Sequence, residues 1–475
     1  MSARSLAVAA SAAGAVFVGL FGSTAASTAA PVTTTVTAPP PEHQADPVLR
    51  THVMRTGPFR VSPYGVINRS DAGKPPPVAG SIVGMDARIV DKNGKAVPQY
   101  KVMLHHFLMT NGGLDNKRRD GACPQRAVRE RFYGTSEELR PMTFPRGYGY
   151  PSDPRDVWKM VWMVMNHRAN RPKVYVEYRV TVDPRPRIPV KPYWLSVVPC
   201  VSDQQYTVPG GGPAVHARAQ RFSLPAGGRI VAIGGHMHGG GIGLRVSQPR
   251  CGDRDLATSL PMYGAADDPL YDVKPLLHEP DPKNMSWWQS ARGWPVVAGE
   301  PLKVTSFYEG MRPHMRVMGI AHVYVAPDAG APTGCAARPA DGAVLGAPFG
   351  GGRPVPPAVR LTLAKQGRNG KAREISRPGG KTRRVGRRAK VRVKLSNFRP
   401  ANLSVAAGAL VRWYFQDRAQ HDITAVDAPR GFASSYSRRG ARFRQRLTIP
   451  GSYRLYCSLH PTRMSQLIRV RPPGT

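Results

Sequence analysis

Acidic residues are scarce in this chain. Its 475 residues include only 30 Asp and Glu against 68 Lys and Arg, so the formal net charge is +38. Nucleic acid is the usual partner of such a basic protein, but the sequence carries no recognisable nucleic-acid-binding motif, and we expect no such partner. An anionic polymer of the cell envelope or an acidic redox protein fits the charge better. A solvated basic tether, concentrated over residues 364–394, explains it equally well.

Long apolar runs are also missing, except at the N-terminus. Arg4 is followed by an Ala-, Val- and Phe-rich run over residues 6–22 and then by small residues up to Ala30. This order is typical of a secretory signal peptide cut near Ala30. A retained N-terminal anchor is the alternative, although the run is short for a membrane span. We therefore expect an exported protein with no membrane span after cleavage of the signal.

Cysteine is rare, and no two cysteines form a C-x-x-C pair, which argues against a cysteine-built metal site upstream. Disulfides form in the oxidising compartments to which exported proteins go. If Cys457 is set aside, four cysteines remain, with three alternative pairings. One bridge in each of two upstream subdomains would join Cys123 to Cys200 and Cys251 to Cys335.

Helical periodicity is missing as well. No long stretch repeats its apolar residues about every 3.6 positions. The 49 Gly, the 48 Pro and the Val-rich runs favour an all-β protein rich in turns. A chain of this length exceeds what one core usually serves, so two or three domains are expected. Residues 31–50 and 326–358 have the composition of a linker and an interdomain tether.

Four side chains near the C-terminus form the ligand set of a blue copper site. Cys457, His460 and Met464 can come from one loop between two strands, while His421 comes from an earlier part of the same domain. Two His and one Cys in a trigonal plane, with a distant axial Met, are typical blue copper ligands. A structural free thiol beside an incidental His is the alternative.

The residues around these four side chains resemble the cupredoxin family. The resemblance covers residues 391–472 and is carried by "NFRPANLSVAAGALVRWYF", "HDITA" and "GSYRLYCSLHPTRM". It implies a Greek-key β-barrel that holds one type 1 copper through His421, Cys457, His460 and Met464.

Further histidines occur upstream in metal-ligand patterns. Neighbouring strand residues face opposite sides, so His105 and His106 can share a metal only if their strand is bulged or ends there. The spacing of His236 and His238 places both imidazoles on one face of a strand. His167 follows a buried strand that could deliver a third imidazole.

The order of these ligands, a His-His pair, a single His, an HxH pair and a Met, resembles the copper type II monooxygenases over residues 80–330. These are the peptidylglycine- and dopamine-hydroxylating enzymes and their exported relatives. The resemblance implies two jelly-roll-like β-sandwich domains with one copper each. It assigns the electron-transfer copper to His105, His106 and His167. It assigns the copper that binds dioxygen to His236, His238 and Met318.

The methionine ligand has alternatives. Met318 is preferred because its segment runs directly into a strand, as in the family, but His314 and Met315 remain substitutes. Three other histidines fit no pattern and are expected to be structural or exposed: His216, His278 and His322.

Together these signals predict six segments. They are a signal peptide (1–30), a linker and N-terminal extension (31–79), two monooxygenase-like β domains (80–205 and 206–330), a Gly/Pro-rich and then basic linker (331–390), and a cupredoxin domain (391–475).

Two functions follow from this organisation. The first is an exported copper monooxygenase with His236, His238 and Met318 as catalytic residues. In the family the electrons come from a small reductant such as ascorbate, and here the blue copper domain could relay them across the tether. The second is a non-catalytic copper-binding or electron-carrying envelope protein with β-sandwich scaffold domains.

Missing motifs exclude other chemistries. Laccases need several HxH pairs and a His-Cys-His run, but this chain has one HxH pair, and Cys457 lies between Tyr456 and Ser458. The adjacent Cys-His pair of copper nitrite reductases is absent too. No G-x-S-x-G, HExxH or P-loop motif supports hydrolysis.

Overall fold

The computed structural model describes residues 46, 48–346 and 352–473, and nearly all regular structure in these ranges is β-strand. A 3-10 turn, η1 (Pro249–Cys251), is the one exception among them. The predicted all-β class is therefore confirmed. The predicted signal peptide, residues 1–30, lies outside the described residues. In the described ranges, no helix has the length and apolar character needed to cross a membrane.

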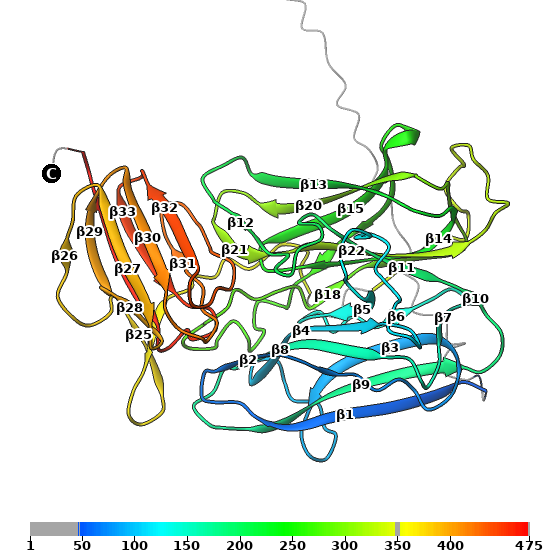
Figure 1. Ribbon diagram of the computed structural model, residues 1–475, viewed down its shortest axis with the longest axis horizontal. Helices are drawn as coiled ribbons and strands as arrows, with labels where there is room; N and C mark the ends of the chain where they lie inside the picture. Colours follow the sequence, from blue (N-terminus) through cyan, green and yellow to red (C-terminus); the bar gives the residue numbers. More distant parts are fainter. Residues whose placement is uncertain (1–45, 47, 347–351, 474–475) are drawn as a thin grey trace, which may run out of the picture. The chain divides into compact units, whose positions relative to one another are not determined.

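Two sheets form the first sandwich (Figure 1). One has the strand order β1 (Arg50–Arg60), β9 (Lys173–Asp183), β3 (Gly80–Val90), β7 (Tyr148–Ser152) and β10 (Ile188–Pro189), with β6 (Met142–Thr143) also paired to β3. The other has the order β2 (Val66–Ala72), β8 (Trp158–Asn166), β4 (Val102–Asn111) and β5 (Glu130–Thr135). Their inner faces meet where the Phe107 ring lies 5.8 Å from the Tyr178 ring. Because β1 and β2 belong to these sheets, the domain begins at Arg50, inside the segment predicted as an extension.

The second sandwich also has two sheets. One has the order β11 (Lys191–Ser196), β22 (Gly319–Pro327), β14 (Gly228–Met237), β19 (Trp287–Val296) and β23 (Ala343–Leu345). The other has the order β13 (Val215–Ser223), β20 (Pro301–Glu309), β15 (Gly241–Gln248) and β16 (Arg254–Ser259). Ile233, Val246 and Val304 lie in the core between the sheets. The predicted boundaries at 206 and 330 fall inside this fold, since β11 precedes the first and β23 follows the second.

The first two sandwiches share an apolar core. The Tyr324 hydroxyl of β22 donates a hydrogen bond to the Phe132 carbonyl at 2.8 Å, and its ring packs edge-on against Phe144 at 4.9 Å. This packing places β4 and β14, which carry the predicted metal ligands, in one connected structure.

Three short antiparallel pairs complete the upstream part. They are β12 (Tyr206–Val208) with β21 (His314–Val317), β17 (Pro261–Met262) with β18 (Asn284–Met285), and β24 (Leu363–Gln366) with β25 (Ala372–Ile375).

The C-terminal sandwich contains the predicted blue copper ligands (Figure 1, orange to red). One sheet has the order β26 (Arg383–Arg384), β29 (Asn402–Ala406), β34 (Ser465–Arg471), β33 (Gly451–Tyr456) and β31 (Thr424–Asp427). The other has the order β28 (Asn397–Arg399), β27 (Arg388–Lys394), β30 (Ala409–Phe415) and β32 (Arg442–Leu447). Buried Trp413 joins the two sheets, because its indole N–H donates to Gln466 at 2.9 Å. Strands β26 and β27 begin before residue 391, the predicted start of this domain.

The two predicted disulfides are present. Cys123 is bonded to Cys200, and Cys251 is bonded to Cys335, whereas Cys457 is free and buried. Each bridge closes a loop of about eighty residues, which limits the freedom of the unfolded chain and so stabilises the fold.

A glycine allows the strand that carries His236 to lie against its neighbour. A Cβ atom at Gly234 would collide with the indole ring of buried Trp287 on β19. We therefore expect Gly234→Ala to lower the free energy of unfolding by about 1–3 kcal/mol, the usual cost of overpacking a core. The matched control is Gly243→Ala on β15, where the added Cβ meets its nearest neighbours at an ordinary 3.9 Å. Urea unfolding measures both, and equal stabilities would contradict this account.

Candidate metal centres

The blue copper ligands lie on loops at one end of the C-terminal sandwich. His421 lies between β30 and β31, and Cys457 directly follows β33. Backbone hydrogen bonds then fold the loop back: the His460 N–H donates to the Cys457 carbonyl at 2.9 Å, and the Cys457 N–H donates to the Met464 carbonyl at 3.0 Å. The loop thus brings three of the four predicted ligands together, and Met464 is fully buried there.

The donor atoms lie close to the separations of a trigonal metal site. Cys457 Sγ lies 3.5 Å from His460 Nδ1 and 3.9 Å from His421 Nδ1. Metal bonds of about 2.0–2.3 Å, as at zinc, place trigonal ligands roughly 3.5–3.7 Å apart. The same three residues form a group whose donor atoms all lie within 4.8 Å of one another. Their chemistry and spacing therefore fit a copper ion.

Neighbouring carboxylates orient His421 and affect the pKa of Cys457. His421 Nε2 donates to Asp417 at 2.9 Å, which leaves the Nδ1 lone pair facing Cys457. Burial, and then the Asp422 carboxylate, raise the pKa of the Cys457 thiol well above its ordinary value. A thiolate in this place needs a cation beside it, and a bound metal ion would supply one.

Asp422 also joins the two ligand loops. Its carboxylate accepts hydrogen bonds from the Ser458 N–H and the Thr424 hydroxyl, both at 2.7 Å. Since Ser458 follows Cys457 and Asp422 follows His421, these bonds set the spacing of the two ligands.

The histidine pair upstream lies on a bulged strand. In the pairing of β4 with β8, Leu104 lies opposite Val164 and His106 opposite Met163, so His105 is the extra residue. The bulge lets both rings turn the same way, and their Nδ1 atoms are 3.3 Å apart. The sequence predicted that His105 and His106 could share a metal only if their strand is bulged or ends there, and the strand is bulged.

Five imidazoles gather in one place, the upstream histidine cluster. Its members are His105, His106, His236, His238 and His278. The ring of His105 lies 5.3 Å from that of His238 and 4.5 Å from that of His278. The family resemblance places His105 and His106 at one copper site and His236 and His238 at another. Here the four residues and His278 form a single group, because the bulge at His105 and the end of β14 face each other.

His278, expected to be structural or exposed, belongs to this cluster. It lies with Asp281 in the loop sequence "HEPD", and the close spacing of an imidazole and two carboxylates was the signal in the sequence. His278 Nε2 lies 3.1 Å from Glu137 and 3.4 Å from Asp281. His236 Nδ1 likewise lies 3.1 Å from Glu138. The centre thus contains buried carboxylates as well as imidazoles.

Burial keeps most of these imidazoles neutral. It lowers the pKa of His238 to about 3 and that of His106 to about 4, and it holds the pKa of His105 well below its usual value. Their lone pairs are therefore free for a metal at neutral pH. His278 differs: burial lowers its pKa, but Asp281 and Glu137 outweigh this effect and raise it to about 10.

The remaining predicted ligands are His167 and Met318, with His314 as a predicted substitute. His167 is buried, and within the described ranges neither of its ring nitrogens has a hydrogen-bond partner. Met318 lines a cavity of about 180 Å³ together with His106 and His236. His314 is held between Glu279 at 2.9 Å and Glu309 at 3.1 Å, so both of its nitrogens are occupied and it is no longer an alternative ligand.

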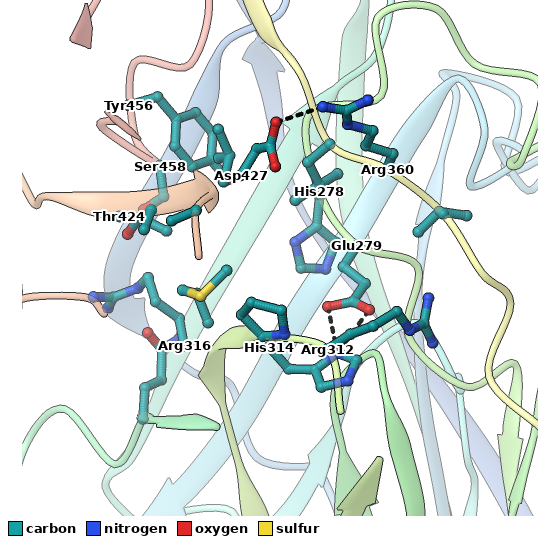
Figure 2. Close-up of a pocket in the computed structure, with 18 of the residues that line it drawn as sticks. His278, Glu279, Arg312, His314, Arg316, Arg360, Thr424, Asp427, Tyr456 and Ser458 are labelled. Atoms are coloured by element: carbon teal, nitrogen blue, oxygen red, sulfur yellow. Dashed lines mark hydrogen bonds and ion pairs between the residues drawn. The ribbon is translucent and has the colours of Figure 1, made fainter. Parts of the chain in front are cut away.

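A larger cavity, of about 390 Å³, lies between the histidine cluster and the C-terminal sandwich. His105, His278 and Met315 line its upstream side. Tyr456 and Ser458, the two neighbours of Cys457, line the other. Figure 2 shows His278 and Glu279 facing the Tyr456 and Ser458 side across this space.

Arg316 is buried where the two sides meet. It donates to the Ser434 carbonyl at 2.6 Å and to Asp203 at 3.1 Å, and it lies 3.6 Å from Asp422. Its guanidinium also covers the ring of Tyr436 at 3.9 Å. One upstream side chain therefore contacts the carboxylate that spaces the blue copper ligands.

Comparison with solved structures finds similarity to cupredoxins. The chain matches no protein family and no curated protein. A purple cupredoxin from Nitrosopumilus maritimus is 27% identical, covering 18% of this chain and 99% of that one, with a TM-score of 0.16. A copper(I) amicyanin variant is 17% identical, covering 18% and 83%, with a TM-score of 0.17. At such TM-scores these likenesses carry no argument, and the assignment of the site rests on its ligand geometry.

Removing the Arg316 charge tests the contact between the sandwiches. In Arg316→Met the buried Asp422 carboxylate loses its cation, and we expect a loss of about 3 kcal/mol in the free energy of unfolding. Arg360→Met is the control, because its ion pair with Asp427 also reaches the C-terminal sandwich but is exposed, and such pairs contribute little. Urea unfolding gives the free energy of unfolding of both variants. Equal losses would show that the buried Arg316 charge does not stabilise the contact between the sandwiches.

Proposed function

We propose that this protein is an exported copper oxidoreductase with two functional centres. His421, Cys457, His460 and Met464 would hold a type 1 copper, which would supply a one-electron couple. The electrons would then reach the upstream histidine cluster, where a monooxygenase-type reaction would take place.

One hydrogen bond carries the proposal. Tyr456 directly precedes Cys457, and its buried hydroxyl donates to the Leu277 carbonyl at 3.1 Å. Leu277 is bonded to His278, whose ring lies 4.5 Å from that of His105. A continuous path of covalent bonds and one hydrogen bond therefore joins the thiolate ligand to the histidine cluster. It takes the place of the Cys-His connection that this sequence lacks.

A second contact also connects the neighbourhood of Cys457 to the upstream histidines. The Ser458 hydroxyl, next to Cys457, lies 3.4 Å from the Tyr436 hydroxyl. Tyr436 in turn lines the smaller cavity with His106, His236 and Met318. Both neighbours of Cys457 are thus directed toward upstream histidines.

Electrons would enter at the other side of the blue site. His460 is only partly buried, unlike His421 and Cys457, and Arg463 beside it is exposed. A small anionic reductant or an acidic redox protein suits this basic edge. The rest of the positive surface suits an anionic polymer of the cell envelope.

The reaction needs both electrons and a sheltered site. Copper, when bound, supplies a one-electron couple and a place for dioxygen to be reduced. Hydroxylation of a C–H bond consumes dioxygen, two electrons and two protons, and yields the alcohol and water. The reductant supplies the electrons. The upstream histidine cluster, with Met318 beside His106 and His236 in the smaller cavity, is proposed to hold the reacting centre. The larger cavity gives a small substrate access to it.

Export is supported by the two disulfides, which suit an oxidising compartment. It is supported also by the signal-like sequence of residues 1–30.

A second candidate function is copper storage or transfer without catalysis. Met163, Met165 and Met315 line the larger cavity together with His105. Thioethers and neutral imidazoles favour copper(I), so this cavity could hold the metal itself as cargo.

Loss of the thiolate ligand separates the two functions. In Cys457→Ser we expect the blue absorption to vanish. Oxygen uptake driven by a small reductant should fall sharply, because the copper site that receives the electrons is lost. A storage protein would consume no oxygen before or after the change. Unchanged oxygen uptake in Cys457→Ser would remove the relay from the account.

The proposed path has its own test. Tyr456→Phe removes the hydrogen bond to Leu277 but leaves every copper ligand, so we expect an unchanged blue spectrum and a several-fold slower oxygen uptake. Tyr453→Phe on the same strand is the matched control, since its hydroxyl donates to Ile449 inside the C-terminal sandwich. If both variants behave alike, the Tyr456 contact is not the route.

A further inference from the structure

The upstream histidine cluster contains a ligand set that the copper monooxygenase pattern does not include. One donor atom each from His105, His238 and Asp281 lie within 4.8 Å of one another, and all three residues are buried. We infer that these three residues bind a divalent transition-metal ion, with Asp281 as a direct ligand. The inference rests on the proposed function, because it names the ligands of the upstream centre.

An unsatisfied nitrogen points to this ligand. His238 is 3% exposed, and its Nε2 atom has no hydrogen-bond partner among the described residues. A buried polar atom without a partner costs free energy. A metal ion bound to this nitrogen would give it the partner that it lacks.

The carboxylate is positioned as metal-ligating carboxylates are. One oxygen of Asp281 accepts the Gly239 N–H at 2.8 Å, and the other lies 3.4 Å from the Ser136 hydroxyl. Ser136 also donates to the carbonyl of His105, at the bulge. The same groups therefore fix two of the three ligands relative to each other, which is the usual task of the groups around a metal site.

His278 and Glu137 complete the surroundings. They form an ion pair beside Asp281, with His278 Nε2 3.1 Å from Glu137 and 3.4 Å from Asp281. A bound metal ion would add positive charge beside these two buried acidic groups.

The donor set indicates which ions fit. Two imidazoles and one carboxylate, with open positions, are typical of iron(II) oxygenase sites, and imidazole and carboxylate together also bind copper(II). A site of this kind differs from the thioether-containing set expected for copper(I). The larger cavity, which His105 also lines, gives the open positions access to a small substrate.

The test uses the full-length protein with the blue site removed by Cys457→Ala and His421→Ala together. This parent protein, stripped of metal, is titrated with Cu²⁺ in air, followed by calorimetry and EPR, and with Fe²⁺ without oxygen, followed by calorimetry. We expect one ion to bind, and Asp281→Asn to weaken binding by at least about tenfold. Asp281→Glu, which keeps a carboxylate, should bind more tightly than Asp281→Asn.

Asp156→Asn is the matched control, because Asp156 is a buried carboxylate that pairs with Asn111 rather than with the cluster. It should bind metal as the parent does. The unfolding midpoint without metal confirms that each variant is folded, and a rise in this midpoint on adding metal is an independent sign of binding.

The outcomes separate this inference from the proposed function. Unchanged binding in Asp281→Asn with loss of binding in His238→Ala would overturn the carboxylate ligand but keep an upstream metal centre. Binding of neither ion by the parent protein would overturn both. Loss of binding in Asp281→Asn and in His238→Ala, but not in Asp156→Asn, supports the ligand set, whatever the oxygen-uptake assays show.

Discussion

The contact between the Cys457 loop and the loop that carries His278 is the constraint on which the proposed function depends. The Tyr456 hydroxyl reaches the Leu277 carbonyl, and Arg316 lies against Asp422, so the two centres are joined by direct contacts. A blue copper domain on a flexible tether alone would meet its partner only by diffusion. Here the loops that position the predicted ligands also form the contact, so a change in one candidate centre can reach the other through it.

Burial governs the chemistry of both centres. In the C-terminal sandwich it raises the pKa of the Cys457 thiol, so the reactive thiolate depends on a bound cation. Upstream it lowers the pKa of His105, His106 and His238, so neutral imidazoles remain available as ligands. His278 differs from these three, because the nearby Glu137 and Asp281 raise its pKa.

Much of this could be predicted from local sequence. The spacing of Cys457, His460 and Met464 is a property of one loop, and the HxH spacing of His236 and His238 is a property of one strand, so both patterns are visible in the sequence. The Val-rich runs likewise predicted the all-β class. The gathering of the upstream histidines into one cluster could not be predicted from local sequence. It depends on how β4 and β14 pack and on the loop that carries His278 and Asp281. The role of residues 50–72 was missed for the same reason, since β1 and β2 are paired with strands about a hundred residues away.

The most direct test of the central claim is the fate of a single electron placed on the blue centre. The copper-loaded protein is reduced by a short radiolytic pulse without oxygen, and its blue absorption is followed in time. The account predicts bleaching and then recovery at a first-order rate that does not depend on protein concentration, as the electron moves to the upstream centre of the same molecule. Bleaching that persists, or that recovers at a rate proportional to protein concentration, would contradict it.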